Sequence, residues 1–260
     1  MPDLRVSIVQ SALHWEDAAA NRALFAKKLA SLKGTTDLVL LPEMFTTGFS
    51  MRSRELAEPM DGPTVAWMRE QAMALDAALY GSVIITADGK YHNRGLFVEP
   101  DGQVTVYDKR HLFRFANETD HYSAGEERVV VGWRGWRILL QICYDLRFPV
   151  FSRNPRNNGY DMALYVANWP EVRRHPWSTL LVARAIENQA YVAGVNRTGD
   201  DGSGLPYSGD SVVIDPKGQV IAGVEPSRQG VATATLDMAA LKDFRTKFPA
   251  GNDADDFRLG

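Results

Sequence analysis

The sequence predicts an α/β protein in which two sheets pack face to face and helices cover their outer sides. Stretches with the two-residue period of a strand alternate with stretches of helical period along most of the chain. An order of strand, loop, strand, turn and strand also occurs twice, from Tyr80 to Val104 and again from Tyr191 to Val220. Turns of this composition are common by chance. Two similar halves nevertheless favour two packed sheets over two unrelated domains.

The first half begins with a strand at residues 4–10, where apolar and polar residues alternate. Residues 18–32 carry leucine and phenylalanine at helical spacing, and Gly34 ends this helix. The apolar run 37–41 stops at Pro42 and predicts a strand that is buried on both faces. Pro63 is well placed in the first turn of a helix over 63–78. Strands are expected at 78–86, 95–99 and 104–108.

The second half repeats this alternation. A buried strand at 137–142 leads into a helix from about Pro149, and a strand at 162–167 precedes a helix over 178–189. Further strands are expected at 190–195, 211–214, 220–224 and 231–236. Because no linker rich in proline, glycine or serine divides the chain, we expect one domain over 1–260. The polar residues 249–260 form a tail that lies at a subunit interface or is frayed.

Composition excludes several classes of protein. The 260 residues are 45% hydrophobic and 23% charged, with a net charge of −3, so the basic stripe of a nucleic-acid-binding protein is absent. No apolar run approaches the roughly 18 residues of a membrane span, and the N-terminus does not resemble a signal peptide. We therefore expect a cytoplasmic protein without nucleic-acid or membrane partners. The single cysteine and the absence of phosphate-binding or metal-ligand motifs predict no cofactor and no metal.

Three chemically active side chains follow predicted strands. Glu43 comes after the strand 37–41, Lys109 after 104–108 and Cys143 after 137–142. In open α/β sheets, ligand sites lie beyond the carboxyl ends of strands. An isolated glutamate or lysine is most often a solvated surface charge, and a free cysteine is most often a small buried apolar residue. The positions of these three residues favour a catalytic site instead.

Cys143 lies where an apolar strand changes to a polar turn and a helix that starts with proline, as at a nucleophile elbow. A helix N-terminus and a neighbouring cation both favour the thiolate. A cysteine that attacks an acyl carbon also needs a base. Histidine is the usual base, and His111 and His121 lie close to Lys109 in the sequence. Glu43 is the other candidate, because its apolar surroundings should raise the pKa of a carboxyl group.

Three segments resemble the signature segments of the nitrilase (carbon–nitrogen hydrolase) superfamily: LPEMFTTGF at 41–49, YDKRHLF at 107–113 and ICYDLRFP at 142–149. The resemblance extends over essentially the whole chain, from residue 5 to residue 218. It implies an α-β-β-α sandwich that pairs into a homodimer with eight layers. By match to these segments, Glu43 is the general base, Lys109 stabilises the oxyanion and Cys143 is the nucleophile. The histidine-based alternative then becomes the minor one.

The same resemblance suggests further residues of the site. The backbone N–H of Tyr144 would hold the oxyanion together with Lys109. Glu118 resembles a second glutamate that orients the lysine, although Glu126 competes for this role. Four segments, including VANWP at 166–170 and FPAGNDADDF at 248–257, are most similar to the omega-amidase branch. This branch resembles enzymes that hydrolyse the terminal amide of 2-oxoglutaramate and 2-oxosuccinamate.

The carboxylate of such a substrate needs a cationic partner, and guanidinium groups bind carboxylates in a bidentate manner. Structural roles are the alternative: Arg147 can form a pair near the cysteine turn, and Arg173 can belong to a solvated helix start. Phe115 and Trp169 can equally pack in the core or at an interface. The candidate substrate-binding residues are Phe115, His121, Arg147, Asn168, Trp169 and Arg173. Three other functions stay open: hydrolysis of N-carbamoyl amines, hydrolysis of simple aliphatic amides, and a non-catalytic subunit that has lost its chemistry.

Overall fold

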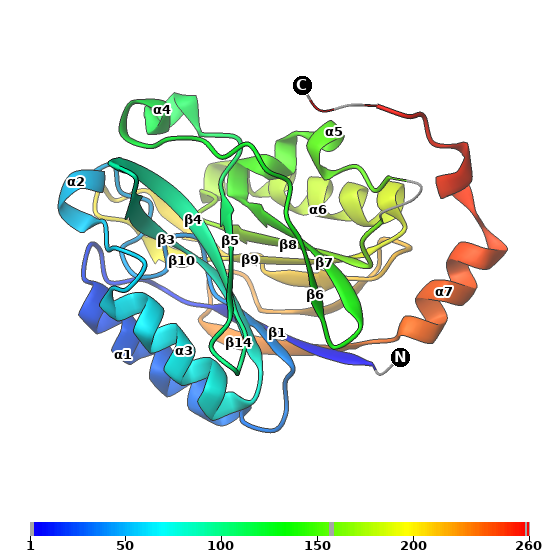
Figure 1. The fold of residues 1–260 in the computed structure, drawn as a ribbon, viewed down its shortest axis with the longest axis horizontal. Coiled ribbons are helices and arrows are strands. Elements are labelled where there is room, and N and C mark those ends of the chain that lie inside the picture. Colours follow the sequence, from blue (N-terminus) through cyan, green and yellow to red (C-terminus); the bar gives the residue numbers. More distant parts are fainter. Residues whose placement is uncertain (1–2, 156–158, 258, 260) are drawn as a thin grey trace.

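Two six-stranded sheets lie at the centre of the structure, a computed structural model that describes residues 3–155, 159–257 and 259 (Figure 1). The strand order is β14-β1-β2-β3-β4-β5 in the first sheet and β13-β12-β9-β8-β7-β6 in the second. Together with the helices outside them, the sheets form the predicted α/β sandwich.

The first sheet combines parallel and antiparallel pairs. Its strands are β1 (Leu4–Gln10), β2 (Leu38–Leu40), β3 (Ala78–Ala87), β4 (Lys90–Val98), β5 (Val104–Asp108) and β14 (Gly230–Leu236). Strands β1, β2 and β3 are parallel because helices α1 (Ala18–Leu29) and α3 (Pro63–Leu75) connect them. Strands β4 and β5 follow as antiparallel hairpins, and β14 pairs with the free side of β1.

The second sheet repeats this plan. Its strands are β6 (Val130–Trp133), β7 (Trp136–Ile142), β8 (Met162–Ala167), β9 (Tyr191–Asn196), β12 (Val212–Ile214) and β13 (Val220–Gly223). Strands β7, β8 and β9 are parallel, and β12 and β13 follow as antiparallel neighbours, as β4 and β5 do in the first sheet. The repeated order that the sequence shows is therefore a repeat of sheet topology.

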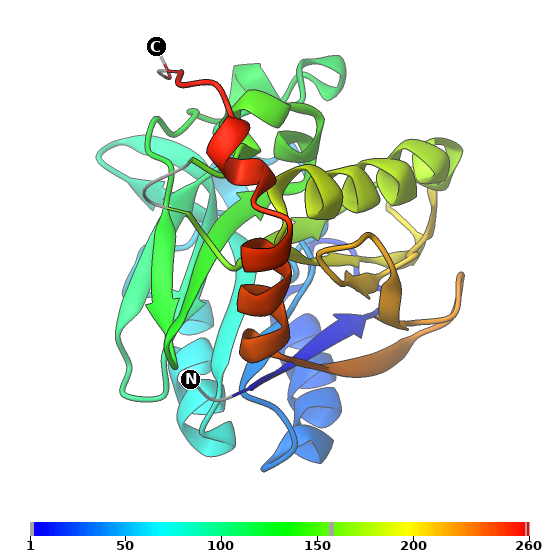
Figure 2. The same cartoon turned by 90° about the vertical axis from the view of Figure 1, so that its right-hand side faces the viewer.

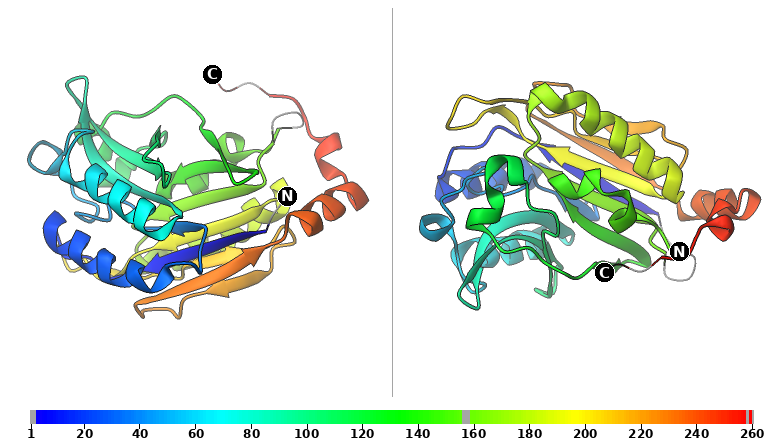
Figure 3. Two further views of the ribbon diagram at one scale, coloured as in Figure 1. Left: turned by 60° about the horizontal axis from the view of Figure 1, so that its bottom comes forward. Right: turned by 90° about the horizontal axis from the view of Figure 1, so that it is seen from above.

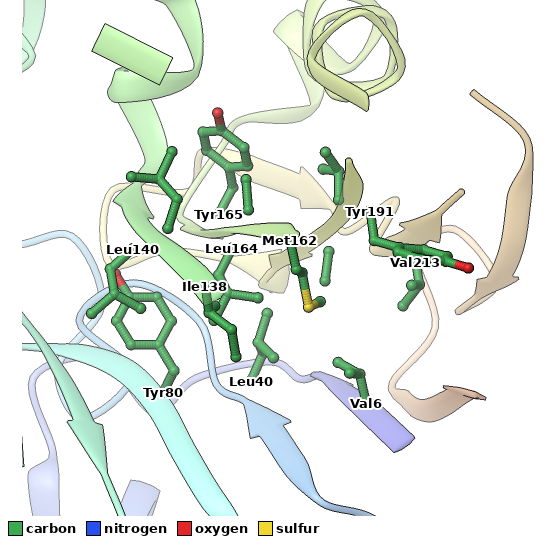
Figure 4. Packing of buried hydrophobic residues seen from close by; sticks show 14 of the residues in the cluster. Val6, Leu40, Tyr80, Ile138, Leu140, Met162, Leu164, Tyr165, Tyr191 and Val213 are labelled. Carbon is green, nitrogen blue, oxygen red and sulfur yellow. The ribbon is translucent and has the colours of Figure 1, made fainter. Parts of the chain in front are cut away.

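The space between the sheets is filled by side chains from both of them (Figure 4). Val6, Leu40 and Tyr80 of the first sheet face Ile138 and Leu164 of the second, and all five side chains are fully buried. The alternate residues of the first sheet, such as Val39 and Leu79, pack under α1 and α3 instead. Both faces of β2 are thus apolar, which is why its sequence reads as a continuous apolar run.

Helices cover the two outer faces. Figure 3 shows α1 and α3 on one side of the sandwich and α6 (Arg174–Asn188) on the other. Helix α7 (Met238–Lys247) follows β14 and lies beside the N-terminal strand, away from α1 and α3 (Figure 2). The shorter elements are α2 (Ser53–Leu56), α4 (Glu118–His121), α5 (Pro149–Ser152), β10 (Thr198–Asp200) and β11 (Pro206–Ser208). In the described part of the chain, no helix has the length and apolar character needed to cross a membrane.

Several predicted boundaries are wrong. Helix α3 ends at Leu75 because Asp76 adopts a left-handed backbone conformation. Strand β4 begins at Lys90 and not at residue 95, since the turn at Asp88 and Gly89 lets its polar first half pair with β3. Helix α6 starts at Arg174, because a proline in the first turn removes no helical hydrogen bond. The sequence analysis did not predict α7 or β6.

The last residues are partly ordered against the molecule. A short 3-10 helix spans Ala250–Asp253, and the side chain of Ala254 is buried. Phe257 and Leu259 are exposed to 41% and 45%. The predicted tail 249–260 includes residues 258 and 260, which lie outside the described residues.

Candidate active site

Three strand ends bring Glu43, Lys109 and Cys143 together, as the sequence predicted. Glu43 follows β2 and Lys109 follows β5, both in the first sheet, whereas Cys143 follows β7 in the second. The Lys109 Nζ atom donates a hydrogen bond of 2.8 Å to Glu43 Oε1, and both side chains are fully buried. The Cys143 thiol donates to the backbone carbonyl oxygen of Asn168 at 3.8 Å, and the Glu43 carboxylate is near enough to raise the pKa of the thiol. A base, a cation and a nucleophile therefore meet between the two sheets.

Glu118 is the second carboxylate at the lysine. Lys109 Nζ lies 3.0 and 2.9 Å from its two oxygens, and the side chain of Glu118 is fully buried at the start of α4. The backbone N–H of Phe113 donates to the same carboxylate. The competing candidate, Glu126, is exposed. The position beside Lys109 is thus occupied by Glu118.

Asn93 also belongs to this cluster, although the sequence analysis did not identify it. Its side-chain Nδ2 donates to Glu43 Oε1 at 2.7 Å and to Glu118 Oε1 at 3.3 Å. Its carbonyl oxygen accepts from the backbone N–H of Lys109 at 3.0 Å. The residue lies in the polar half of β4 that was not predicted to be a strand. A correct assignment of β4 would have placed Asn93 near Lys109, because β4 pairs with β5.

A second asparagine, Asn168, binds both the carboxylate and the backbone of Glu43. The backbone N–H of Asn168 donates to Glu43 Oε2 at 2.8 Å, and its side chain donates to the carbonyl oxygen of Glu43. Asn168 follows β8, next to β7 in the second sheet. Each oxygen of the Glu43 carboxylate thus accepts from a fixed donor, so its position relative to Cys143 is well determined.

Burial and the paired carboxylates set the charges of the site. Burial disfavours the Lys109 ammonium, but the negative charges of Glu118 and Glu43 outweigh this effect and raise the pKa of Lys109. Burial is also the main reason why the pKa of Glu118 is raised, with the Glu43 carboxylate adding to it and Lys109 opposing it. Lys109 is therefore a permanent cation at neutral pH.

The Cys143 thiol behaves differently from the sequence-based expectation. Burial and then the adjacent Glu43 carboxylate raise the pKa of the Cys143 thiol well above its usual range, and the attraction of Lys109 does not compensate. The thiol is consequently protonated at neutral pH and needs a base when it reacts. The expectation of a stabilised thiolate was wrong, because it considered the cation and neither the burial of the thiol nor the adjacent carboxylate.

Cys143 does lie at a sharp turn. Its φ angle is +45°, in the left-handed region, and it begins the 3-10 helix Cys143–Arg147 directly after β7. This conformation costs a residue with a side chain of the order of 1 kcal/mol, so the surrounding structure must hold it. The predicted nucleophile elbow is thus present in its backbone geometry.

The histidine-based alternative is wrong. His111 directs its Nδ1 atom toward Asp145 Oδ1 at 2.8 Å and stacks on Phe148, so it is committed to the elbow and not to the thiol. His121 lies at the exposed end of α4. Neither histidine is among the residues that line the cavity at Cys143, and His121 is therefore also excluded from the predicted substrate-binding set.

A cavity of about 430 Å³ opens onto Cys143 and Lys109. Of the predicted substrate-binding residues, Phe115, Arg147, Asn168, Trp169 and Arg173 line it, as does Tyr144. Further walls were not predicted, because they come from loops that only the fold brings together. These walls include Trp15, Phe49, Met51, Phe113, Leu205 and Tyr207.

The cavity carries more positive than negative charge. Its charged lining residues are Lys109, Arg147, Arg173 and Asp201. The guanidinium of Arg147 lies 4.9 Å from the ring centre of Trp169, and that of Arg173 lies 5.1 Å from the ring centre of Phe115. No carboxylate of a described residue forms an ion pair with either arginine. Such a lining suits an anionic ligand.

In the described part of the chain, no group of three or more histidine, cysteine, aspartate or glutamate side chains is arranged to hold a metal ion. The arrangement instead suits acyl transfer. It places a nucleophile, a base and an oxyanion-stabilising cation around one cavity.

The chain belongs to the carbon–nitrogen hydrolase family, whose sequence pattern matches residues 5–246. It is 52% identical over 259 residues to omega-amidase YafV of Escherichia coli strain K12, with 100% of both chains covered. It is 33% identical over 221 residues to 2-oxoglutaramate amidase of Bacillus subtilis strain 168, with 84% of each chain covered. The chain is therefore a carbon–nitrogen hydrolase that is similar over its full length to an omega-amidase.

The fold also matches a solved structure. This structure is XC1258 from Xanthomonas campestris, a CN-hydrolase superfamily protein with an arsenic adduct in the active site. The TM-score is 0.98 at 52% sequence identity, and 100% of each chain is covered. The predicted nitrilase-like sandwich is thereby confirmed.

Proposed function

We propose that the protein hydrolyses the terminal amide of small dicarboxylic acid monoamides, such as 2-oxoglutaramate and 2-oxosuccinamate, to the acid and ammonia. The observation that carries this proposal is the cavity that joins the buried Glu43–Lys109–Cys143 cluster to two arginines without a carboxylate partner among the described residues. The amide would lie at Cys143 and the substrate carboxylate at Arg147 or Arg173. The names of the two relatives support the same substrate class.

The first half of the proposed reaction forms a thioester. Glu43 accepts the thiol proton while Cys143 Sγ attacks the amide carbonyl carbon. The oxyanion is stabilised by the Lys109 ammonium and by the backbone N–H of Tyr144. When the tetrahedral intermediate collapses, the C–N bond breaks and the proton held by Glu43 leaves with ammonia.

The second half releases the acid. Glu43 takes a proton from water, and the resulting hydroxide attacks the thioester carbonyl carbon. The C–S bond breaks, and the proton returns to the Cys143 sulfur. The raised thiol pKa fits this sequence, because a thiolate stabilised too strongly would be a weak nucleophile and the thiol instead loses its proton to an adjacent base as it reacts.

Glu118, Asn168, Phe115 and Trp169 have supporting roles in this proposal. Glu118 keeps the Lys109 ammonium directed at the oxyanion position through its two hydrogen bonds. Asn168 orients Glu43, and the two aromatic side chains form apolar walls beside the arginines. Apolar walls strengthen the attraction between a guanidinium and a carboxylate because they exclude water.

The test is ammonia release by the purified protein from 2-oxosuccinamate and glutaramate, with N-carbamoyl-β-alanine, butyramide and an aliphatic nitrile in parallel. We expect release from the two dicarboxylic monoamides and none with Cys143→Ala. Release from only one of the other compounds would replace the proposed substrate class and keep the mechanism. No release from any compound would favour the non-catalytic subunit.

We further propose that the single domain works as a cytoplasmic homodimer with the tail 249–260 at the subunit interface. The exposed side chains of Phe248, Phe257 and Leu259 support this arrangement, because exposed apolar residues in one segment favour burial against a partner. The molar mass in solution tests it. A dimer that becomes a monomer after deletion of 249–260 is expected, and a monomeric full-length chain would contradict it.

A further inference from the structure

Asp145 connects the two segments that carry Cys143 and Lys109. Its side chain is fully buried two residues after the cysteine, where it would be costly without hydrogen-bond donors. It accepts from the backbone N–H of Ile142 at 2.9 Å, just before the left-handed Cys143. This bond closes the first turn of the elbow on the strand that leads into it. Asp145 Oδ2 thus holds the nucleophile segment.

The other contacts of Asp145 come from the lysine segment. Tyr107 donates its hydroxyl to Asp145 Oδ2 at 2.7 Å, and the backbone N–H of His111 donates to Oδ1 at 3.0 Å. His111 Nδ1 lies 2.8 Å from Oδ1. Tyr107 and His111 stand two residues on either side of Lys109. The carboxylate therefore bridges the end of β5 in one sheet and the end of β7 in the other.

The residues that make these contacts do not act on the substrate directly. Asp145, Tyr107 and His111 do not line the cavity, and Lys109 and Tyr144 do. The hydrogen bonds of Asp145 instead control the distance between the Lys109 segment and the Cys143 turn. Lys109 sits in the middle of the segment that Asp145 holds, and the N–H of Tyr144 belongs to the turn that Asp145 closes. These are the two donors that the oxyanion needs.

We propose that Asp145 is a positioning residue that fixes the Lys109 ammonium and the Tyr144 N–H at the separation required by the oxyanion, with Tyr107 and His111 as its anchors on the lysine segment. The inference rests on the roles given above to Lys109 and Tyr144. It explains why the signature segment carries His111 close to Lys109, and this explanation needs no proton transfer by the histidine. It also explains why two segments from different sheets share one buried carboxylate.

Loss of the positioning by Asp145 should weaken binding of the transition state and not binding of the substrate. An oxyanion forms only after attack, so a displaced donor lowers kcat and leaves KM nearly unchanged. Displacement of a catalytic group by about 1 Å can cost about 10²-fold in rate. Asp145 has four hydrogen-bonding contacts, so loss of one should displace the donors less, and we expect kcat of Tyr107→Phe to fall about tenfold. Alkylation of Cys143 by iodoacetamide creates no oxyanion and should change by less than about threefold.

The experiment compares Tyr107→Phe with Tyr80→Phe as a matched control. Tyr80 is equally buried, and its hydroxyl donates at 3.1 Å to the carbonyl oxygen of Gln141 in the same strand that leads to the elbow. Each variant loses one buried hydroxyl and the hydrogen bond that it donates. The Tyr107 hydroxyl also accepts from the backbone N–H of Arg110 at 3.3 Å. Both are assayed for thermal midpoint, kcat and KM on the best amide of the panel above, and rate of alkylation. We expect only Tyr107→Phe to lose kcat, with less than twofold change for Tyr80→Phe.

Equal losses of kcat in the two tyrosine variants, or a loss in Tyr107→Phe that appears in KM, would overturn the inference. The same holds if alkylation falls as far as kcat, because the cysteine itself would then be misplaced. Asp145→Asn should lose more than Tyr107→Phe. If that variant does not fold, His111→Asn and His111→Ala replace it, and the asparagine, which keeps a donor near the Nδ1 position, should retain more activity.

Failure of the proposed substrate class can be distinguished from failure of the positioning role of Asp145. If the wild-type protein hydrolyses none of the amides, protection of Cys143 from iodoacetamide by butyraldehyde measures the same geometry, since the thiohemiacetal oxygen occupies the oxyanion position. Weaker protection in Tyr107→Phe than in Tyr80→Phe would support the positioning role. Equal protection would refute it.

Discussion

Replacement of Glu43 by glutamine should lower both the rate of hydrolysis and the pKa of the Cys143 thiol. Glu43→Gln removes both the base and the negative charge next to the Cys143 thiol, while the shape of the side chain is retained. Hydrolysis should fall, because the proposed base is lost. The pKa of the thiol should also fall, because the charge of Glu43 contributes to raising it and Lys109 continues to lower it.

The sign of the shift follows from the charge that is removed. A negative charge next to the thiol favours its neutral form, so removal of the Glu43 carboxylate favours the thiolate. The glutamine side chain still excludes water from the thiol, so burial continues to oppose ionisation while the pKa falls. Loss of a general base lowers turnover by about 10² to 10⁴-fold.

The assay is the rate of iodoacetamide alkylation between pH 6 and pH 10, followed by mass spectrometry. Because Cys143 is the only cysteine, a single product is formed. The pH midpoint should be lower in Glu43→Gln than in the wild type, whereas Glu126→Gln, which removes an exposed carboxylate, should leave it unchanged. A midpoint that stays the same or rises in Glu43→Gln would refute the assignment of the raised thiol pKa to this carboxylate.

Four other substitutions test the remaining parts of the site. Glu118→Gln removes the charge that holds Lys109 through two hydrogen bonds, and kcat should fall about 10- to 100-fold, since a hydrogen bond to a charged group contributes about 1.5–3 kcal/mol; an unchanged kcat would contradict the orienting role. Arg147→Gln should raise KM for 2-oxosuccinamate about tenfold and leave KM for butyramide unchanged, and the same assay on Arg173→Gln identifies which arginine binds the carboxylate. Asn93→Ala should lower kcat about tenfold without loss of the circular dichroism spectrum, because Glu43 loses a hydrogen bond of 2.7 Å; full activity would show that this contact is dispensable.

The sequence located the chemistry better than it located the elements. Glu43, Lys109 and Cys143 were found because each follows an apolar strand, and the carboxyl ends of strands in an α/β sheet collect ligand sites. Local information is sufficient for this step. The start of β4 was misplaced because its first residues are polar, although their backbone groups pair with β3 along the whole hairpin.

Because the start of β4 was misplaced, the sequence analysis did not identify Asn93. Its place in the cluster depends on the register of β4 against β5, and register is a property of strand pairing and not of local composition. Phe113 and Tyr207 became cavity walls for the same kind of reason. They lie far apart in the sequence, and only the packing of the loops brings them to one cavity.

The sequence by itself determined the two-sheet sandwich and the positions of the three reactive side chains, because hydrophobic period and strand-end placement are local signals. Only the tertiary structure decided that the thiol is protonated, that His111 serves the elbow and that His121 stays outside the site. Each of these depends on which charges and donors lie within a few ångströms of a group, and at that range electrostatic interactions in a buried site change a protonation state or fix a side chain.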